Sequence, residues 1–131
     1  MSDRGYIIRN QYAIHFITFS VIQWIDIFTR KVYADIVIDS LKYCKANKGL
    51  KIYAWCIMSN HLHLIVSTDE NYMVSDVIRD FKKFTSVSIL AELKIALPKV
   101  EKIGCFGFLR KQEKVIIEIR IINFGNKIII R

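Results

Sequence analysis

The spacing of hydrophobic positions changes along the chain, and these changes predict its secondary structure. Residues 13–20 (AIHFITFS) are rich in β-branched and aromatic side chains, which predicts a first strand. Over residues 30–47 the apolar positions recur every three or four residues, which predicts an amphipathic helix. These apolar positions are Tyr33, Ile36, Val37, Leu41 and Cys44. We expect Gly49 to end the helix, because glycine tolerates the left-handed conformation found at helix ends.

The middle of the chain predicts a β-hairpin followed by a second helix. Residues 50–58 (LKIYAWCIM) and 62–68 (LHLIVST) have the composition of strands, and residues 59–60 predict a tight turn between them. Ser75 can cap a helix that we expect to extend over residues 76–94. Two strands and a helix therefore follow the first strand and helix.

The predicted order is β-α-β-β-α, and Pro98 marks where the second helix must have ended. This order is most of a ferredoxin-like α+β fold, in which helices cover one face of an antiparallel sheet and leave the other face open. One strand of the usual four is missing from the prediction. Because such folds usually build sites on the open face, side chains that point there are the candidates for function.

The composition indicates a single soluble domain. A chain of 131 residues with 53% hydrophobic content can bury one core. Its apolar runs are far shorter than the roughly 18 to 20 residues needed to cross a bilayer. Its first residues lack the features of a secretion signal, so we expect a cytoplasmic protein. The three cysteines, Cys44, Cys56 and Cys105, suggest neither a disulfide framework nor a thiolate zinc site.

The net charge of +8 favours an anionic partner, and nucleic acid is the commonest one for a small basic domain. Residues 1–78 hold 8 basic and 7 acidic side chains, whereas residues 79–131 hold 12 and 5, so +7 of the charge lies in the C-terminal part. Basic residues that simply keep an apolar chain in solution explain this charge equally well. Four aromatic residues are expected in the core rather than as base-stacking platforms: Tyr53, Trp55, Phe81 and Phe84.

The sequence His61-Leu62-His63 is the main candidate for chemistry. Side chains alternate along a strand, so both imidazoles should project from the open face while their apolar neighbours pack on the helices. Their Cβ atoms would lie about 6 to 7 Å apart, near enough to hold one divalent ion. Two half-exposed histidines without a ligand are the alternative, because this spacing is common. His15 could supply a third ligand, although a packed histidine fits its strand better.

The residues around this pair resemble those of single-tyrosine HUH transposases, in particular the REP-associated subgroup. Residues 53–66 (YAWCIMSNHLHLIV) are similar to the family's strand, turn and His-x-His signature, with Ser59 where the family often has proline. Residues 13–24 are similar to its first strand and the loop after it, and residues 74–89 to its second helix. The resemblance covers about residues 10–94.

This resemblance implies a metal-dependent enzyme that cleaves and rejoins DNA. In the family, two histidines, here His61 and His63, hold Mg²⁺ or Mn²⁺ with a third polar ligand from a C-terminal helix. A tyrosine on that helix attacks the phosphorus and forms a covalent link to single-stranded DNA. The family recognises hairpin DNA, typically as a dimer. The positions that face DNA are matched here by Arg79, Lys82, Lys83, Thr85 and Ser86.

The chain departs from the family at the nucleophile. Its six tyrosines lie at positions 6, 12, 33, 43, 53 and 72, so none follows the second helix and only Tyr72 could conceivably substitute. We therefore expect a protein of DNA transposition that binds single-stranded or hairpin DNA and is catalytically incomplete. The alternatives are a nucleic-acid-binding module without nuclease activity and a decayed transposase remnant.

The last part of the chain also differs from the family. Of the 18 residues in 114–131, eight are isoleucine, a composition that AT-rich codons yield without selection for a fold. We interpret residues 1–94 as the transposase-like core and residues 95–131 as a divergent tail, irregular or truncated by a frameshift soon after Leu93. A genuine final strand over residues 115–122, which could alternate in a sheet, is the alternative.

Overall fold

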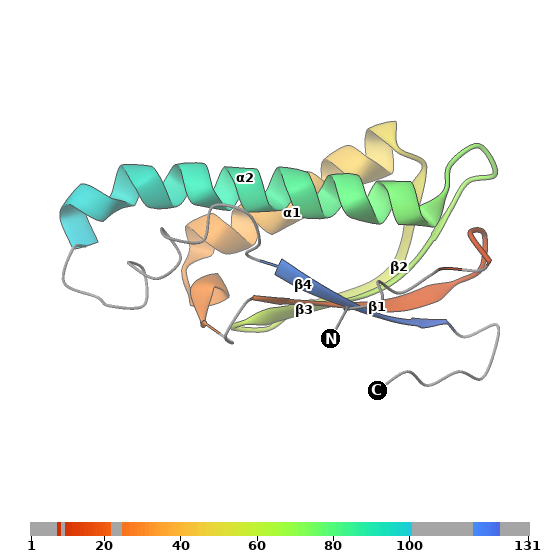
Figure 1. The fold of residues 1–131 in the computed structure, drawn as a ribbon, viewed down its shortest axis with the longest axis horizontal. Helices are drawn as coiled ribbons and strands as arrows, with labels where there is room; N and C mark the ends of the chain where they lie inside the picture. The colour runs from red at the N-terminus through yellow and green to blue at the C-terminus, as the bar shows by residue number, and fades with distance from the viewer. Residues whose placement is uncertain (1–7, 9, 22–24, 101–116, 124–131) are drawn as a thin grey trace, which may run out of the picture.

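A four-stranded antiparallel sheet and two helices make up the part of the chain that the computed structural model describes, which is residues 8, 10–21, 25–100 and 117–123. The elements are β1 (His15–Val21), the 3-10 turn η2 (Ile27–Thr29), α1 (Lys31–Asn47), β2 (Leu50–Ile57), β3 (His61–Thr68), α2 (Val74–Val100) and β4 (Ile117–Asn123). The strand order is β2-β3-β1-β4, and both helices lie on the same side of the sheet (Figure 1). The predicted α+β fold, with both described helices on one face of an antiparallel sheet, is therefore confirmed.

The first helix and the hairpin match the prediction closely. Gly49 adopts a positive φ of 63° after α1 ends, as expected of a residue that reverses the chain into a strand. The ring of Tyr72 packs so closely on Gly49 that a Cβ there would lie 2.3 Å from a ring carbon. At the other end of the hairpin, the amide of Met58 donates to the carbonyl oxygen of His61 and closes the tight turn.

The second helix is longer than predicted at both ends. It begins at Val74, so Ser75 lies inside its first turn and is not the cap; instead the Ser75 amide donates to Oε1 of Gln11 from the segment before β1. The expected stop at Pro98 is wrong, because the helix continues to Val100. A proline close to a helix end removes only one hydrogen bond, which a 27-residue helix can tolerate.

The final strand, which the sequence left as an alternative, is present as β4. It pairs antiparallel with β1, with Thr18 opposite Arg120 and Ser20 opposite Glu118, and it lies at the edge of the sheet. Helix α2 crosses the predicted boundary at residue 94 without interruption. The division into core and tail stays a prediction, and residues 101–116 and 124–131 lie outside the described ranges. The frameshift also stays a prediction, since out-of-frame codons can encode a strand-forming run.

The core lies between the sheet and the helix layer. Alternate residues of β1 and β3 face the helices and are almost fully buried, and Phe19 of β1 meets Phe81 of α2 edge to face at 5.0 Å. The buried strand residues are Ile17, Phe19, Val21, Leu62, Leu64 and Val66. Neither described helix is long and apolar enough to cross a membrane.

Three of the four aromatic residues expected in the core are exposed instead. Tyr53 and Trp55 lie on β2, an edge strand that the helices cover only in part, and are 57% and 58% exposed. Phe84 lies on the outer side of α2, where it stacks on Tyr43 of α1 with centroids 6.1 Å apart. Only Phe81 is buried.

The helix face of β1 also buries a histidine. His15 has no exposed surface and lies beside Val66. Burial lowers the pKa of its imidazole more than the polar backbone of Ala13 raises it. A lowered folded-state pKa means that the unfolded chain binds the proton more readily. Stability that depends on a neutral His15 is therefore complete above about pH 6.5 and is lost as the pH falls towards the folded-state pKa.

We predict that the protein is less stable to denaturant at pH 5 than at pH 7.5, and that His15→Leu makes this dependence shallower. One group can contribute at most about 1.4 kcal/mol per pH unit. His63→Gln is the comparison variant. The pKa of His63 is lowered as well, but its imidazole is only half-buried, so this substitution should change the pH dependence less than His15→Leu does. Equal pH dependence in the wild type and His15→Leu, measured by urea unfolding, would show that the buried imidazole is not responsible.

Candidate metal-binding site on the open sheet face

The turn before β3 fixes the position of the histidine pair. The amide of Val21 donates to the Asn60 carbonyl, and the amide of Phe28 donates to the Ser59 carbonyl. The hydroxyl of Ser59 also donates to Asp26 at 2.8 Å. The turn is thus anchored both to the end of β1 and to the loop that precedes α1.

The structure brings the two predicted histidines together. Leu62, between them, is buried against the helices, so His61 and His63 lie on the opposite face of the sheet. Their ring centroids are 4.7 Å apart and their planes meet at 75°. The prediction that the two imidazoles share the open face is therefore confirmed.

Each imidazole has a polar neighbour at its Nδ1 atom, and sequence reasoning missed both neighbours. Thr18, which pairs with His63 across β1 and β3, places its hydroxyl oxygen 2.9 Å from the Nδ1 atom of His63. Asn60 places its carboxamide oxygen 2.7 Å from the Nδ1 atom of His61. For Thr18, the sequence alone did not supply the strand register, which depends on the pairing of distant segments.

Apolar groups surround the second histidine. Phe16 stacks on the His63 ring with centroids 5.3 Å apart, and Cys56 lies opposite His63 on β2. A shallow hollow of about 150 Å³ lies beside them, with Ala54 and Ile65 among its lining residues. Burial, and to a lesser extent the nearby His61, lowers the pKa of His63, so this imidazole is neutral at pH 7.

The donor set fits a divalent ion in part. Neutral imidazoles are common ligands for first-row metal ions, and a hydrogen bond at Nδ1 is the usual way in which the rest of a protein orients such a ligand. Within the described ranges no group of three histidine, cysteine or acidic side chains could enclose an ion. The described residues therefore offer two ligands and leave positions for water or phosphate oxygens.

Two other proposed members of the site lie elsewhere. The expectation that His15 is a packed histidine rather than a third ligand is confirmed, because its side chain points into the core on the opposite face of the sheet from His63. Tyr72 lies beyond Thr68 at the far end of β3, which spans about 23 Å from His61 at roughly 3.3 Å per residue. This position does not favour Tyr72 as a substitute for the nucleophile, and the suggestion stays a prediction.

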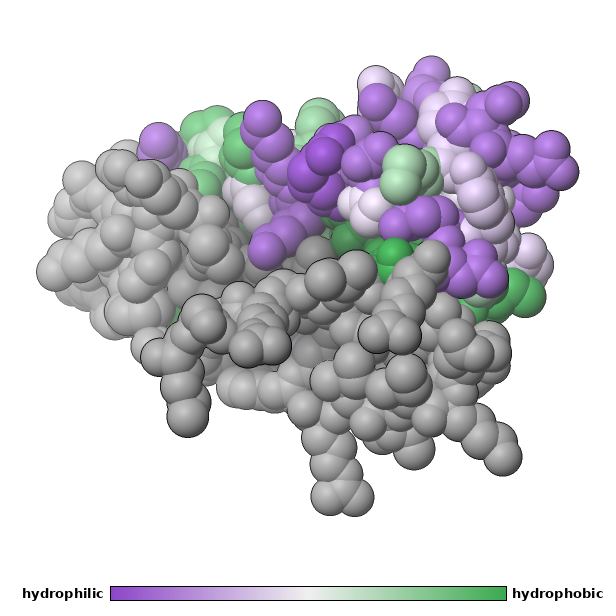
Figure 2. Space-filling model, turned by 45° about the vertical axis from the view of Figure 1, so that its right-hand side comes forward, coloured by the Kyte–Doolittle hydropathy of each residue, from purple (hydrophilic) through white to green (hydrophobic). Residues whose placement is uncertain are grey.

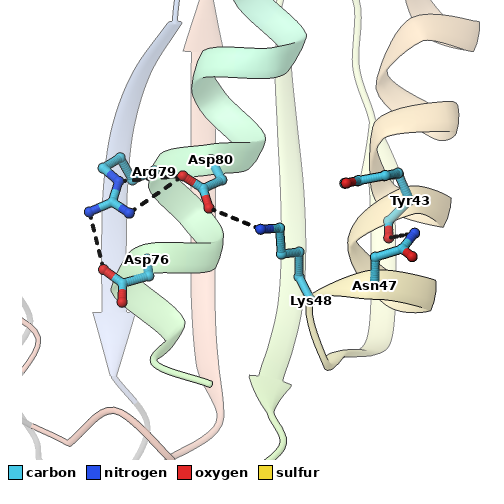
Figure 3. Close-up of polar contacts among 6 residues, drawn as sticks. All are labelled: Tyr43, Asn47, Lys48, Asp76, Arg79 and Asp80. Carbon is cyan, nitrogen blue, oxygen red and sulfur yellow. Dashed lines mark hydrogen bonds and ion pairs between the residues drawn. The ribbon is translucent and has the colours of Figure 1, made fainter. Parts of the chain in front are cut away.

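The predicted DNA-facing residues lie on α2, in the helix layer on the other side of the sheet from the histidines. Thr85 is fully buried, so its predicted contact with DNA is wrong. Arg79 is exposed but lies within ion-pair distance of Asp76 and Asp80, and Asp80 also meets Lys48 at the end of α1 (Figure 3). Such exposed pairs are worth about 1 kcal/mol or less. The positive charge of Arg79 is thus offset by the carboxylates of Asp76 and Asp80.

The remaining residues on α2 lie on its accessible sides. Lys83 is exposed, Lys82 and Ser86 are partly exposed, and neither lysine forms an ion pair with a described residue. The part of the described surface seen in Figure 2 is mostly hydrophilic, with smaller hydrophobic patches between. A role of these residues in binding DNA stays a prediction.

Comparison with known proteins gives two similarities. The family model described as "Transposase IS200 like" matches residues 9–104, which extends ten residues beyond the predicted end of the resemblance at residue 94. Among eight matching solved chains is a crystal structure of a candidate transposase from Deinococcus radiodurans R1, with a TM-score of 0.59, 17% identity, and coverage of 93% of this chain and 84% of that chain. At this identity the likeness shows the fold. No curated protein matches the sequence significantly.

If the histidine pair holds a divalent ion, substitution of either histidine should weaken metal binding more than substitution of a neighbouring residue. We predict that the protein binds Mn²⁺ and that His61→Gln and His63→Gln each weaken this binding at least tenfold, on the order expected for loss of one ligand. Cys56→Ser is the matched control, since Cys56 lies opposite His63 but is a poor ligand for this hard ion. Titration followed by electron paramagnetic resonance measures the free Mn²⁺. Unchanged affinity in both histidine variants would place the ion elsewhere.

Proposed function

Because the chain belongs to the IS200-like transposase family, we propose that it acts in DNA transposition by binding single-stranded or hairpin DNA at the open face of its sheet. The observation that carries this proposal is the pair His61 and His63, which share that face and are each held at Nδ1 by a polar neighbour. Packing alone does not require two imidazoles at 4.7 Å on an otherwise open face. A cytoplasmic location and a homodimeric state belong to the same proposal.

The ion that we propose for the site is Mg²⁺ or Mn²⁺, held by His61 and His63 together with water and DNA oxygens. When bound, such an ion polarises a phosphodiester and stabilises charge on the leaving oxygen. The part of the protein in this chemistry is to hold the two imidazoles in place and to keep that of His63 uncharged. The lowered pKa of His63 serves that purpose, because a protonated ring would repel the cation and could not coordinate it.

We further propose that this chain does not complete the cleavage reaction. Of its tyrosines, Tyr33 is buried and Tyr43 lies on the helix layer. The hydroxyl of Tyr53 is hydrogen-bonded to that of Ser67, which lies four residues and about 13 Å along β3 from His63. Tyr12 precedes β1, close to the end of β3 that is far from the histidine pair. None of the described tyrosines thus stands beside that pair.

Contacts between the helix layer and DNA are also part of the proposal. Lys82 and Lys83, with Arg79 and Ser86, lie on a different face from the histidines, so one strand cannot follow a flat path across both. A hairpin stem that passes around the edge of the molecule could meet the basic residues through its phosphates while its unpaired strand reaches the sheet.

A second candidate function is hairpin or RNA binding without any nuclease activity. The exposed aromatic residue Tyr53 on β2 favours it, because its hydroxyl reaches Ser67 on the same face of β3 as the histidines, and aromatic side chains on an open sheet are common platforms for unpaired bases. This function needs neither a metal ion nor a nucleophile. A decayed remnant without function is the third outcome.

One experiment separates these functions. Full-length protein is incubated with Mn²⁺ and end-labelled hairpin DNA carrying a single-stranded flank, then analysed on native and on denaturing gels. We predict a mobility shift on the native gel, weakened in a His61→Gln/His63→Gln variant, and no covalent adduct on the denaturing gel.

The control is the fully paired duplex of the same sequence, which should bind more weakly. A covalent adduct would contradict the proposed loss of cleavage. A shift that is indifferent to both Mn²⁺ and the histidine variant would favour the binding module, and absence of any shift would favour the remnant.

A further inference from the structure

The hydrogen bonds at the two Nδ1 atoms have a chemical consequence for the histidine pair. A neutral imidazole carries one proton, on either Nδ1 or Nε2, and its other nitrogen provides the lone pair that binds a cation. Free histidine favours the proton on Nε2, which leaves the lone pair on Nδ1. In this protein the Nδ1 atoms are occupied by Thr18 and Asn60, so only the opposite tautomer can present a lone pair to an ion.

The contact with Asn60 has a defined direction. A carboxamide oxygen can only accept a hydrogen bond, so the 2.7 Å contact requires the proton on Nδ1 of His61. The backbone of Asn60 is itself fixed, because its carbonyl oxygen accepts from the amide of Val21 in β1. The oxygen that selects the tautomer is therefore carried by a residue anchored at the end of the sheet.

Thr18 places a hydroxyl, which can accept as well as donate, beside the Nδ1 atom of His63. It lies at the centre of β1, directly opposite His63, and its half-buried hydroxyl oxygen is 2.9 Å from Nδ1. A β-branched side chain on a strand has few χ1 options, so this oxygen stays near the ring. Stacking of Phe16 on the same imidazole further restricts rotation of the ring.

We propose that Thr18 and Asn60 are positioning residues that hold His63 and His61 in the Nδ1–H tautomer, so that the lone pair of each neutral ring lies on Nε2, the atom that would bind a divalent cation. This inference rests on the proposed function for the identity of the ligand, but the tautomers themselves can be measured without metal. Both hydroxyl and carboxamide act through the imidazoles and need not touch the ion or the DNA.

The test uses the metal-free, full-length protein labelled with ¹⁵N in histidine. At pH 8, two-bond proton–nitrogen spectra distinguish the two tautomers of each histidine. We expect Nδ1–H for both His61 and His63. In Thr18→Val the His63 signal should move to the Nε2–H form, while Thr18→Ser, which keeps a hydroxyl, should retain Nδ1–H.

Two further variants complete the comparison. Asn60→Ala should change the tautomer of His61 and leave that of His63. Ser20→Ala is the matched control, because Ser20 lies opposite His61 on β1 and, among the described residues, its hydroxyl forms no hydrogen bond with either imidazole. Far-ultraviolet circular dichroism of each variant establishes that it is folded, and Thr18→Ala replaces Thr18→Val if the latter is not.

Affinity for Mn²⁺ is then measured on the same variants. Thr18→Val should weaken binding about 10- to 100-fold, as loss of a hydrogen bond to a metal-binding histidine typically does, and Thr18→Ser should restore it. An Nε2–H form of His63 in the wild type, or an unchanged tautomer in Thr18→Val, overturns the proposal. If the tautomers respond as expected but the wild type binds no Mn²⁺, the positioning role stands and the metal site of the proposed function fails.

Discussion

The alternation of side chains along β3 is the constraint on which the site depends. Leu62, Leu64 and Val66 are nearly fully buried against α1 and α2, and that burial stabilises each by about 1.5 to 3 kcal/mol relative to an exposed position. A slip of one residue in the register would expose these side chains and bury both imidazoles. The core thus fixes the direction of His61 and His63 without contacting them.

The neighbouring strand supplies a hydrogen-bond partner to one histidine of the pair. Because β1 is antiparallel to β3 and in register with it, Thr18 lies opposite His63 and can reach its Nδ1 atom. The turn at Ser59 and Asn60 serves His61 in the same manner, and its bonds to Asp26, Val21 and Phe28 keep it in place. One face of β1 therefore builds the core and the other supports the imidazoles.

Local patterns in the sequence predicted most of this arrangement. The period of the apolar residues placed α1 and the hairpin, and the period of two along β3 placed the histidines on the open face. The patterns failed where the outcome depended on distant contacts. Thr85 was taken for a surface residue although it lies on the buried side of α2. The helix α2 continued through Pro98, where a proline near a helix end removes only one hydrogen bond.

The position of the strands in the sheet explains the other differences. Trp55 is exposed because β2 is an edge strand, and a sequence pattern does not reveal which strand lies at an edge. The partners of the imidazoles were missed for a related reason, since Thr18 and His63 are 45 residues apart and meet only through strand pairing. Asn60 was next to His61 in the sequence, but its role depends on the geometry of the turn.

The two faces of the molecule have different electrostatic characters. On the helix layer, Arg79 and Lys48 are balanced by Asp76 and Asp80 in a connected set of ion pairs, as Figure 3 shows. The described residues around the histidines carry no comparable set of paired charges. A divalent cation could therefore be drawn either to the imidazoles or to the exposed aspartates of α2, and these two locations lie on opposite sides of the sheet.

Paramagnetic broadening by Mn²⁺ tests this account most directly. Substoichiometric Mn²⁺ is added to ¹⁵N-labelled protein, and the loss of each amide signal reports the distance to the ion. We predict that signals near Thr18, His61 and His63 disappear first, whereas those near Asp76 and Asp80 persist. Broadening centred on Asp76 and Asp80, or none at all, would contradict the assignment of the histidine pair as the metal-binding site.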